Sequence, residues 1–301
     1  MEATATNVSA ELAAELDRAW TLRAAVFPAT IGIARPSHTV AVSLTGPTCA
    51  MDCAHCGGHY LHQMITLDEA MAAATPRVRE ARSFLISGGC QPGLGTVPFM
   101  DHLPELRELR RRGRLNFHVG LVGEHEAVAL RDLADSVSFD LVGDDATINE
   151  VLGLNRRVED YVTTLDVLQR HTAVIPHVLV GMHGGRLRGE RRALELLAGR
   201  NPRALVFIVF VPTPGTRLAA ASPPEALEVA RLMAGARALL PRTPIGLGCM
   251  RPGGAYRSRL DPLAVWAGVQ WIVQPAPAAL AEAAARGLTP EYGEECCVLC
   301  V

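Results

Sequence analysis

The chain has 301 residues, of which 49% are hydrophobic, and a formal net charge of −2 at pH 7. This length is ordinary for a single α/β barrel, and the apolar content is sufficient for a large core, which excludes global disorder. The near-zero net charge predicts no general attraction to nucleic acid or to an anionic membrane surface.

The opening segment, MEATATNVSAELAAELDRAW, has no basic patch followed by an apolar run, so we expect no secretory signal. No apolar stretch reaches the about 20 residues that a membrane span requires. We therefore expect a soluble, cytoplasmic protein. Because the cytosol disfavours disulfides, the eight cysteines predict metal binding or catalysis.

In chain order, a helix is expected at about residues 9–25, followed by eight strands that alternate with helical patterns. The strand runs are 39–44, 83–87, 115–121, 136–142, 174–180, 204–211, 244–248 and 269–273. Most are rich in Val, Ile and Phe without strict alternation, which is typical of parallel strands buried on both faces. Eight strand–helix units predict a closed α/β barrel of the (β/α)8 TIM type. The expected parts are an N-terminal helical extension at 1–36, the barrel at 37–287, and a cysteine-bearing C-terminal tail at 288–301.

Three cysteines, Cys49, Cys53 and Cys56, form a CxxxCxxC pattern directly after the first predicted strand. In a barrel this places them at the C-terminal mouth, where active sites lie. Three thiolates suit a soft metal, either iron in a cluster or zinc, with His55 or His59 as a fourth zinc ligand. A [4Fe–4S] cluster held by only three cysteines leaves one iron open, and the spacing favours this interpretation.

This spacing after a first barrel strand resembles the signature of the radical S-adenosylmethionine (SAM) superfamily. Ser87, Gly88 and Gly89 end the second strand, where that family has a Gly-Gly-Glu motif that receives the SAM amino group. Cys90 replaces the glutamate, so only the backbone role of the glycines carries over. The resemblance spans roughly residues 36–275.

Two further segments match the family in order along the chain. The stretch VLVGMHGGRLRGE (178–190), which contains Gly181, resembles the fifth-strand glycine motif that packs near adenine. PTPGT (212–216), with Pro214 at its centre, resembles the motif after the sixth strand. Each of these glycine segments is also compatible with an ordinary tight turn.

The resemblance implies a SAM-binding [4Fe–4S] cluster and a 5′-deoxyadenosyl radical that removes hydrogen from an unactivated carbon. It implies a ribose contact at the end of the fourth strand, where Asp140 and Asp144 stand. Arg251 follows the seventh strand, and it either binds the SAM carboxylate or a substrate group or is a surface arginine. We interpret His118 and His177, on predicted inner strands, as core histidines.

Five cysteines remain: Cys90, Cys249, Cys296, Cys297 and Cys300. If the tail folds over the barrel mouth, it brings them together as ligands of an auxiliary iron–sulfur cluster, which several radical SAM enzymes use as a sulfur source. The alternatives are small buried residues for Cys90 and Cys249, and redox-labile terminal thiols for the other three.

Within the superfamily the chain resembles the biotin synthase-like branch, through FDLVGDDATINEVLGL (139–154). It is most similar to the two-component lipoyl synthases, through CGGHYLHQM (56–64), GCMRPGG (248–254) and the terminal cysteines. This likeness implies a sulfurtransferase that acts on octanoyl-lysine of a lipoyl carrier domain or peptide. It also implies a second radical SAM subunit and an electron donor such as ferredoxin or flavodoxin.

Two other functions remain open on the sequence. The first is a different radical SAM reaction, such as that of biotin synthase, metallocofactor maturation or a carbon rearrangement. The second is a zinc-stabilised barrel that acts as a binding module.

Overall fold

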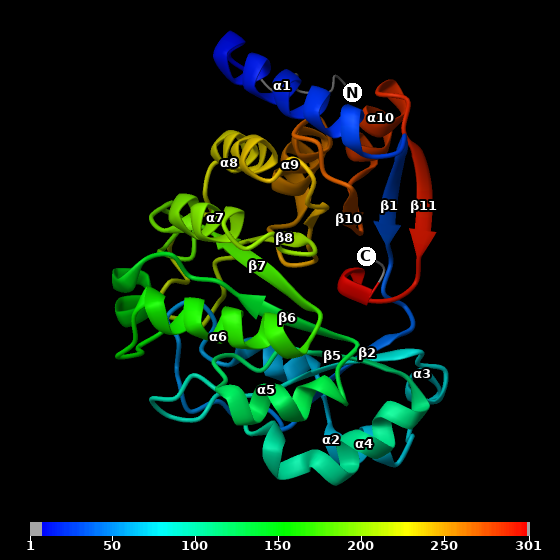
Figure 1. Cartoon of the computed structure of the whole chain (residues 1–301), viewed down its shortest axis with the longest axis vertical. Helices are drawn as coiled ribbons and strands as arrows, with labels where there is room; N and C mark the ends of the chain where they lie inside the picture. Colours follow the sequence, from blue (N-terminus) through cyan, green and yellow to red (C-terminus); the bar gives the residue numbers. More distant parts are fainter. Residues whose placement is uncertain (1–7, 300–301) are drawn as a thin grey trace.

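The computed structural model describes residues 8–299. Its strands form one sheet, in which every pairing is parallel, in the order β11-β1-β10-β9-β8-β7-β6-β5-β4-β2-β3. The sheet curls around an interior, and the helices lie along its outer face (Figure 1). The strands are β1 Thr30–Ala34, β2 Thr39–Ser43, β3 Ile65–Thr66, β4 Ser83–Ser87, β5 Arg114–Phe117, β6 Ser136–Asp140, β7 Val174–Val180, β8 Leu205–Val209, β9 Ile245–Leu247, β10 Trp271–Val273 and β11 Thr289–Gly293.

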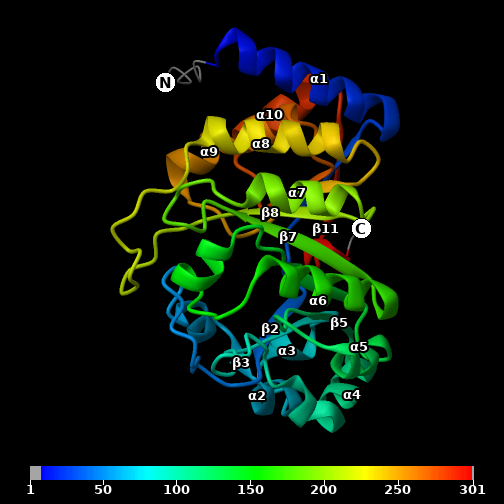
Figure 2. The same ribbon diagram turned by 60° about the vertical axis from the view of Figure 1, so that its left-hand side comes forward.

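The outer helices cover the sheet in chain order, as the turned view in Figure 2 also shows. They are α1 Ala10–Val26, α2 Leu67–Met71, α3 Pro76–Arg79, α4 Leu103–Arg112, α5 Glu124–Arg131, α6 Val158–His171, α7 Glu190–Ala198, α8 Ala226–Leu239, α9 Gly254–Trp266 and α10 Pro277–Ala285. Short helical turns are η1 His59–Gln63, η2 Phe99–His102, η3 Thr147–Val151 and η4 Cys297–Leu299. Within residues 8–299 no helix is long and apolar enough to cross a membrane.

The α/β barrel of the TIM type expected from the sequence is confirmed, and all eight predicted strands are present as β2 and β4 to β10. The expected N-terminal helix is α1, which begins after Ser9, whose side chain accepts a hydrogen bond from the Leu12 amide. Three strands, β1, β3 and β11, were not anticipated. β3 has only two residues, and β11 carries a proline and mostly exposed side chains, so neither has the apolar pattern of a buried strand.

The closed eight-stranded ring expected from the sequence is wrong in one respect, because β1 and β11 stand between β10 and β2. Among the described strands, no pairing joins β11 to β2. The tail crosses this seam instead, since the Cys296 amide donates to Thr39 Oγ1 at 2.7 Å and the His38 amide donates to the Glu294 carbonyl at 2.9 Å. Arg82 and Glu294 add an ion pair of 3.0 Å. The architecture is therefore an open half-barrel whose seam the tail covers.

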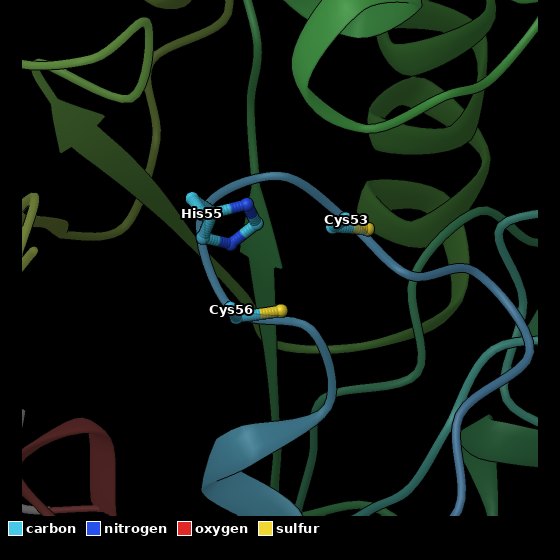
Figure 3. A group of neighbouring side chains, drawn as sticks. All are labelled: Cys53, His55 and Cys56. Atoms are coloured by element: carbon cyan, nitrogen blue, oxygen red, sulfur yellow. The ribbon is translucent and has the colours of Figure 1, made fainter. Parts of the chain in front are cut away.

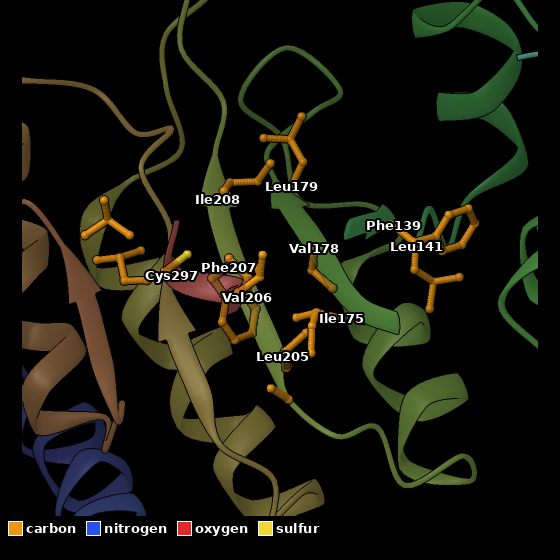
Figure 4. Packing of buried hydrophobic residues seen from close by; sticks show 14 of the residues in the cluster. Phe139, Leu141, Ile175, Val178, Leu179, Leu205, Val206, Phe207, Ile208 and Cys297 are labelled. Atoms are coloured by element: carbon orange, nitrogen blue, oxygen red, sulfur yellow. The ribbon is translucent and has the colours of Figure 1, made fainter. Parts of the chain in front are cut away.

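Beyond the seam the tail packs inside the barrel. Its last described turn, η4, lies against both β6 and β10, and Cys297 belongs to the same buried cluster as Phe207 of β8 (Figure 4). Gly246 makes room on this side, because a Cβ there would lie 1.9 Å from the Trp271 indole. Cys296 and Cys297 are thus placed in the interior of the barrel, beside Thr39 at the start of β2, and not over the mouth at the strand ends as the sequence suggested.

Candidate metal centre and cofactor site

The cysteine triplet lies on the loop that follows β2. After Cys53 the chain turns back on itself, as the amides of Cys56 and Gly57 both donate to the Cys53 carbonyl at 3.1 and 2.8 Å. Gly57 and Gly58 follow with φ of 48° and 75°, a region that favours glycine. This turn brings the ligand atoms of Cys53, His55 and Cys56 within 4.8 Å of one another (Figure 3).

Cys49 lies beside this turn, and two glycines pass close to it. A Cβ on Gly58 would lie 3.3 Å from the Cys49 Cβ, and a Cβ on Gly89 would lie 2.6 Å from the Cys49 Cα. The Gly89 amide also donates to Thr45 Oγ1 at 2.7 Å. The Ser87–Gly89 segment predicted from the sequence therefore runs directly beside the first cysteine.

The loop after β8 supports the cysteine loop from the other side. Tyr60 Oη and Thr213 Oγ1 share a hydrogen bond of 2.9 Å, and the Leu218 amide donates to the Ala54 carbonyl at 3.1 Å. Arg217 donates to the Asp52 carbonyl at 2.9 Å. Pro214 itself lies at the exposed turn of this loop. The hydrogen bonds of its neighbours hold the cysteine loop in place.

The thiols influence one another strongly. A hydrogen bond between Cys53 and Cys56 lowers the pKa of Cys56 and raises that of Cys53. Burial, with the neighbouring Cys49 and Cys56, raises the pKa of Cys90 to about 12. Several thiolates held this close repel one another, and a bound soft cation would remove that repulsion. The donor set of Cys49, Cys53 and Cys56 therefore fits a three-cysteine iron–sulfur cluster.

His55 keeps the zinc alternative open. Its ligand atom lies with those of Cys53 and Cys56, and its Nδ1 is buried without a hydrogen-bond partner among the described residues. Three thiolates and one imidazole also make a tetrahedral zinc site.

A pocket opens at the C-terminal ends of β6 and β7. Its lining includes Asp140, Asp144 and Glu190, with backbone of the 181–190 loop. The Glu190 carboxylate accepts from the amides of Gly181 and Arg188, both at 2.7 Å, and so shapes that loop. Gly181 has φ of 76°, and a Cβ there would lie 2.8 Å from Pro224. The predicted ribose residue Asp140 and the predicted adenine loop thus border one pocket.

Arg251 is placed differently from its predicted role as a SAM ligand. Its side chain is fully buried and forms two 2.8 Å bonds with Asp261. It also donates to the carbonyls of Gly248 at 2.6 Å and Val273 at 2.9 Å. Because these partners occupy the guanidinium, Arg251 ties the end of β9 to α9 and β10 and does not face a ligand.

The remaining cysteines divide into two places. Cys90 lies with the triplet, as the pKa effect of Cys49 and Cys56 shows. Cys249 lies with the tail pair Cys296 and Cys297. Burial and Cys296 raise the pKa of Cys249, and Cys296, burial and Cys249 raise the pKa of Cys297. The hydrogen bond from Cys297 lowers the pKa of Cys296 to about 7. Cys300 lies outside the described residues.

A polar group that the sequence interpretation missed lies on the inner face of β5 to β7. His118 Nε2 and Asp140 Oδ2 form an ion pair of 3.2 Å, with about a third of each side chain exposed. The ring of His177 stacks on His118 with 6.0 Å between centroids. Burial alone would raise the pKa of Asp140, but His118 lowers it overall. His177 is buried, as expected of a core histidine, whereas about a third of the His118 side chain is exposed, so His118 is not an ordinary core residue.

The signal for this group was the spacing of polar residues within otherwise apolar strands. Asn116 and His118 stand two residues apart, as do Ser138 and Asp140, so each pair faces one side of the sheet. Asn116 and Ser138 bond to each other across the strands at 3.1 Å, and Asn116 also contacts Cys296 Sγ at 3.8 Å. The sequence shows the pairs but not that they face the tail.

No protein-family model matches the sequence. No curated protein matches it either. Among solved structures, methylornithine synthase (PylB) is similar with a TM-score of 0.65 and 13% identity, over 94% of this chain and 90% of that one. The FeFe-hydrogenase maturase HydG from Carboxydothermus hydrogenoformans is similar with a TM-score of 0.63 and 15% identity, over 95% of this chain and 73% of that one. At these identities the likeness shows the fold, and the chain has the fold of these two enzymes.

Proposed function

We propose that the protein is a radical SAM enzyme. The observation that carries this proposal is the clustering of Cys53 and Cys56 on the loop after β2. Cys49 is near enough to influence the pKa of Cys53, and Gly58 and Gly89 pack beside Cys49. A [4Fe–4S] cluster with bound SAM would supply a 5′-deoxyadenosyl radical at this position. The three thiolates would hold the cluster, while the glycine backbone and the pocket lined by Asp144 and Glu190 would orient SAM.

The finer proposal is sulfur insertion at an unactivated carbon. Its support is the second cysteine group, in which Cys249, Cys296 and Cys297 influence one another's pKa. The turn η4, which begins at Cys297, packs against β6 and β10. With Cys300 these residues offer four thiols for an auxiliary cluster. The resemblance to two-component lipoyl synthases then gives octanoyl-lysine of a lipoyl carrier as the substrate. It also gives a second radical SAM subunit and a ferredoxin or flavodoxin as partners.

A second candidate is a different radical SAM reaction on a small polar substrate. The polar inner wall of His118, Asp140 and His177 favours it, because an alkyl chain offers no hydrogen bonds to these groups. Methylornithine synthase, whose name specifies an amino acid product, shares the fold, and the hydrogenase maturase HydG is a precedent for metallocofactor maturation. In this case the tail cysteines would be structural or would deliver electrons.

Metal analysis of the anaerobically reconstituted protein tests these proposals together. Two [4Fe–4S] clusters predict about eight iron and eight sulfide per chain, and one cluster predicts about four of each. Addition of SAM should change the electron paramagnetic resonance signal of the reduced protein. If the protein instead binds zinc at the triplet and SAM leaves its spectrum unchanged, the radical SAM proposal is contradicted and the binding module is favoured. Incubation with SAM, dithionite and an octanoyl-lysine peptide, followed by mass analysis for added sulfur, tests the lipoyl substrate.

A further inference from the structure

The inner wall between the two cysteine groups has hydrogen-bond acceptors without partners. Asp140 Oδ2 pairs with His118, but Asp140 Oδ1 has no hydrogen-bond partner among the described residues. His177 Nδ1 lies 3.0 Å from the Ile175 carbonyl. A carbonyl only accepts, so Nδ1 carries the proton and the neutral ring presents Nε2 as an acceptor. No hydrogen bond joins that Nε2 to any residue in 8–299.

Asp140 and its partner His118 lie between the two cysteine groups. Asp140 is close enough to Cys90, beside the triplet, to raise its pKa. His118 is close enough to Cys296 to influence the pKa of that thiol, and Asn116 contacts its sulfur. Asp140, His118 and Asn116 therefore span the distance from one cysteine group to the other along β5 and β6. A substrate attacked between these groups must lie against this wall.

The chemistry of the wall limits what can lie there. The neighbouring polar groups, Asn116 and Ser138, already satisfy each other in both directions at 3.1 and 3.2 Å. The acceptor atoms without a partner are Asp140 Oδ1 and His177 Nε2, and each needs a hydrogen-bond donor. A buried acceptor that loses water without gaining a donor costs free energy, so a plain alkyl chain fits this wall poorly.

We propose that Asp140 and His177 bind N–H donors that flank the reacting carbon of a small polar substrate, such as an amine, amide or urea. This inference rests on the proposed radical SAM function and selects between its two substrate classes. His118 acts as a positioning residue, because its ion pair and ring stacking hold both acceptors in place.

Probe binding to the reconstituted, SAM-loaded protein tests the proposal by saturation-transfer NMR. The probes are imidazolidin-2-one, a neutral N–H donor, 1,3-diaminopropane, a cationic one, and an octanoyl-lysine peptide. We expect at least one donor probe to bind, and if both bind, each should displace the other. The affinity for a bound probe should fall at least about tenfold in Asp140→Asn and in His177→Phe. His177→Phe keeps an aromatic ring on His118 but removes the acceptor. Ser136→Ala is the matched control, since Ser136 lies on the same strand and bonds only to the Ala173 carbonyl.

The outcomes separate the inference from the function on which it rests. If neither donor probe binds the wild-type protein, or if only the octanoyl peptide binds, the inference is wrong while SAM cleavage still supports the radical enzyme. If Asp140→Asn loses SAM affinity but not probe affinity, Asp140 serves the cofactor and the inference is also wrong. If the wild-type protein assembles no SAM-responsive cluster, the proposed function itself fails. The wild-type comparison stands even where a variant does not fold.

Discussion

Gly89 passes so close to Cys49 that a methyl carbon on it would lie 2.6 Å from the Cys49 Cα and 2.1 Å from the Thr48 carbonyl oxygen. Two segments far apart in the chain are thus held together by the absence of a side chain. One carries the first metal ligand, and the other carries the backbone beside the proposed SAM site. Because Gly89 meets backbone atoms and not the end of a flexible side chain, neither segment can move without disturbing the other.

Gly89→Ala should therefore displace Cys49 and reduce iron binding on reconstitution, while the folded barrel persists. The measurement is iron and sulfide content per chain, with the circular dichroism melt as a check on folding. Gly235→Ala is the control, since Gly235 lies in α8 with open space around it, and alanine there should stabilise the helix by about 0.5–1 kcal/mol. Normal iron content in Gly89→Ala would show that the close contact does not position Cys49.

The buried pair of Arg251 and Asp261 should govern stability and not SAM affinity. Arg251→Met leaves the Asp261 carboxylate enclosed without its partner, which should lower the free energy of unfolding by about 3–5 kcal/mol. Urea denaturation measures the change. The exposed pair of Arg259 and Glu225, at 3.6 Å, provides the control, and Arg259→Met should cost less than about 1 kcal/mol. A loss of SAM affinity in Arg251→Met at unchanged stability would instead support the role expected from the sequence.

Cys90 should be dispensable for the SAM-binding cluster. It lies beside the triplet, but it follows β4 and stands outside the CxxxCxxC pattern of the loop after β2, whose three cysteines are the proposed ligands. Cys90→Ala should therefore keep the iron of this site and the spectral response to SAM, whereas Cys53→Ala should lose both. Loss of iron in Cys90→Ala would make it a fourth ligand, and such a closed site would leave no iron free for SAM.

The Thr39 hydroxyl should hold the tail across the seam. It bonds both Ser83 Oγ and the Cys296 amide, each at 2.7 Å. Thr39→Val keeps the shape but leaves the Cys296 amide unpaired, at a cost of about 1–3 kcal/mol. In the metal-free, reduced protein, Cys297 should then react faster with a thiol reagent, as mapped by mass spectrometry. Thr163→Val, on the exposed face of α6, should leave that rate unchanged, and an equal rate in both variants would show that this bond does not hold the tail.

The fold was largely predictable because each barrel strand is a short apolar run with its own helix, and such local patterns survive in any tertiary context. The strand β11 was missed because TPEYG is mostly exposed and pairs only with β1. The role of Arg251 was misjudged for a related reason. The sequence around an arginine in a glycine-rich loop does not tell whether its side chain faces a ligand or an aspartate elsewhere in the chain. Here the partner is the buried Asp261, ten residues later.

The sequence by itself determined the barrel strands and the cysteine triplet, because residues within one loop are neighbours whatever the rest of the chain does. Only the tertiary structure decided that Cys90 joins the triplet while Cys249 meets Cys296, and that Asp140, His118 and His177 form one wall. Alternation along a strand tells which side a residue faces, but the register between strands and the curvature of the sheet decide which residues meet there.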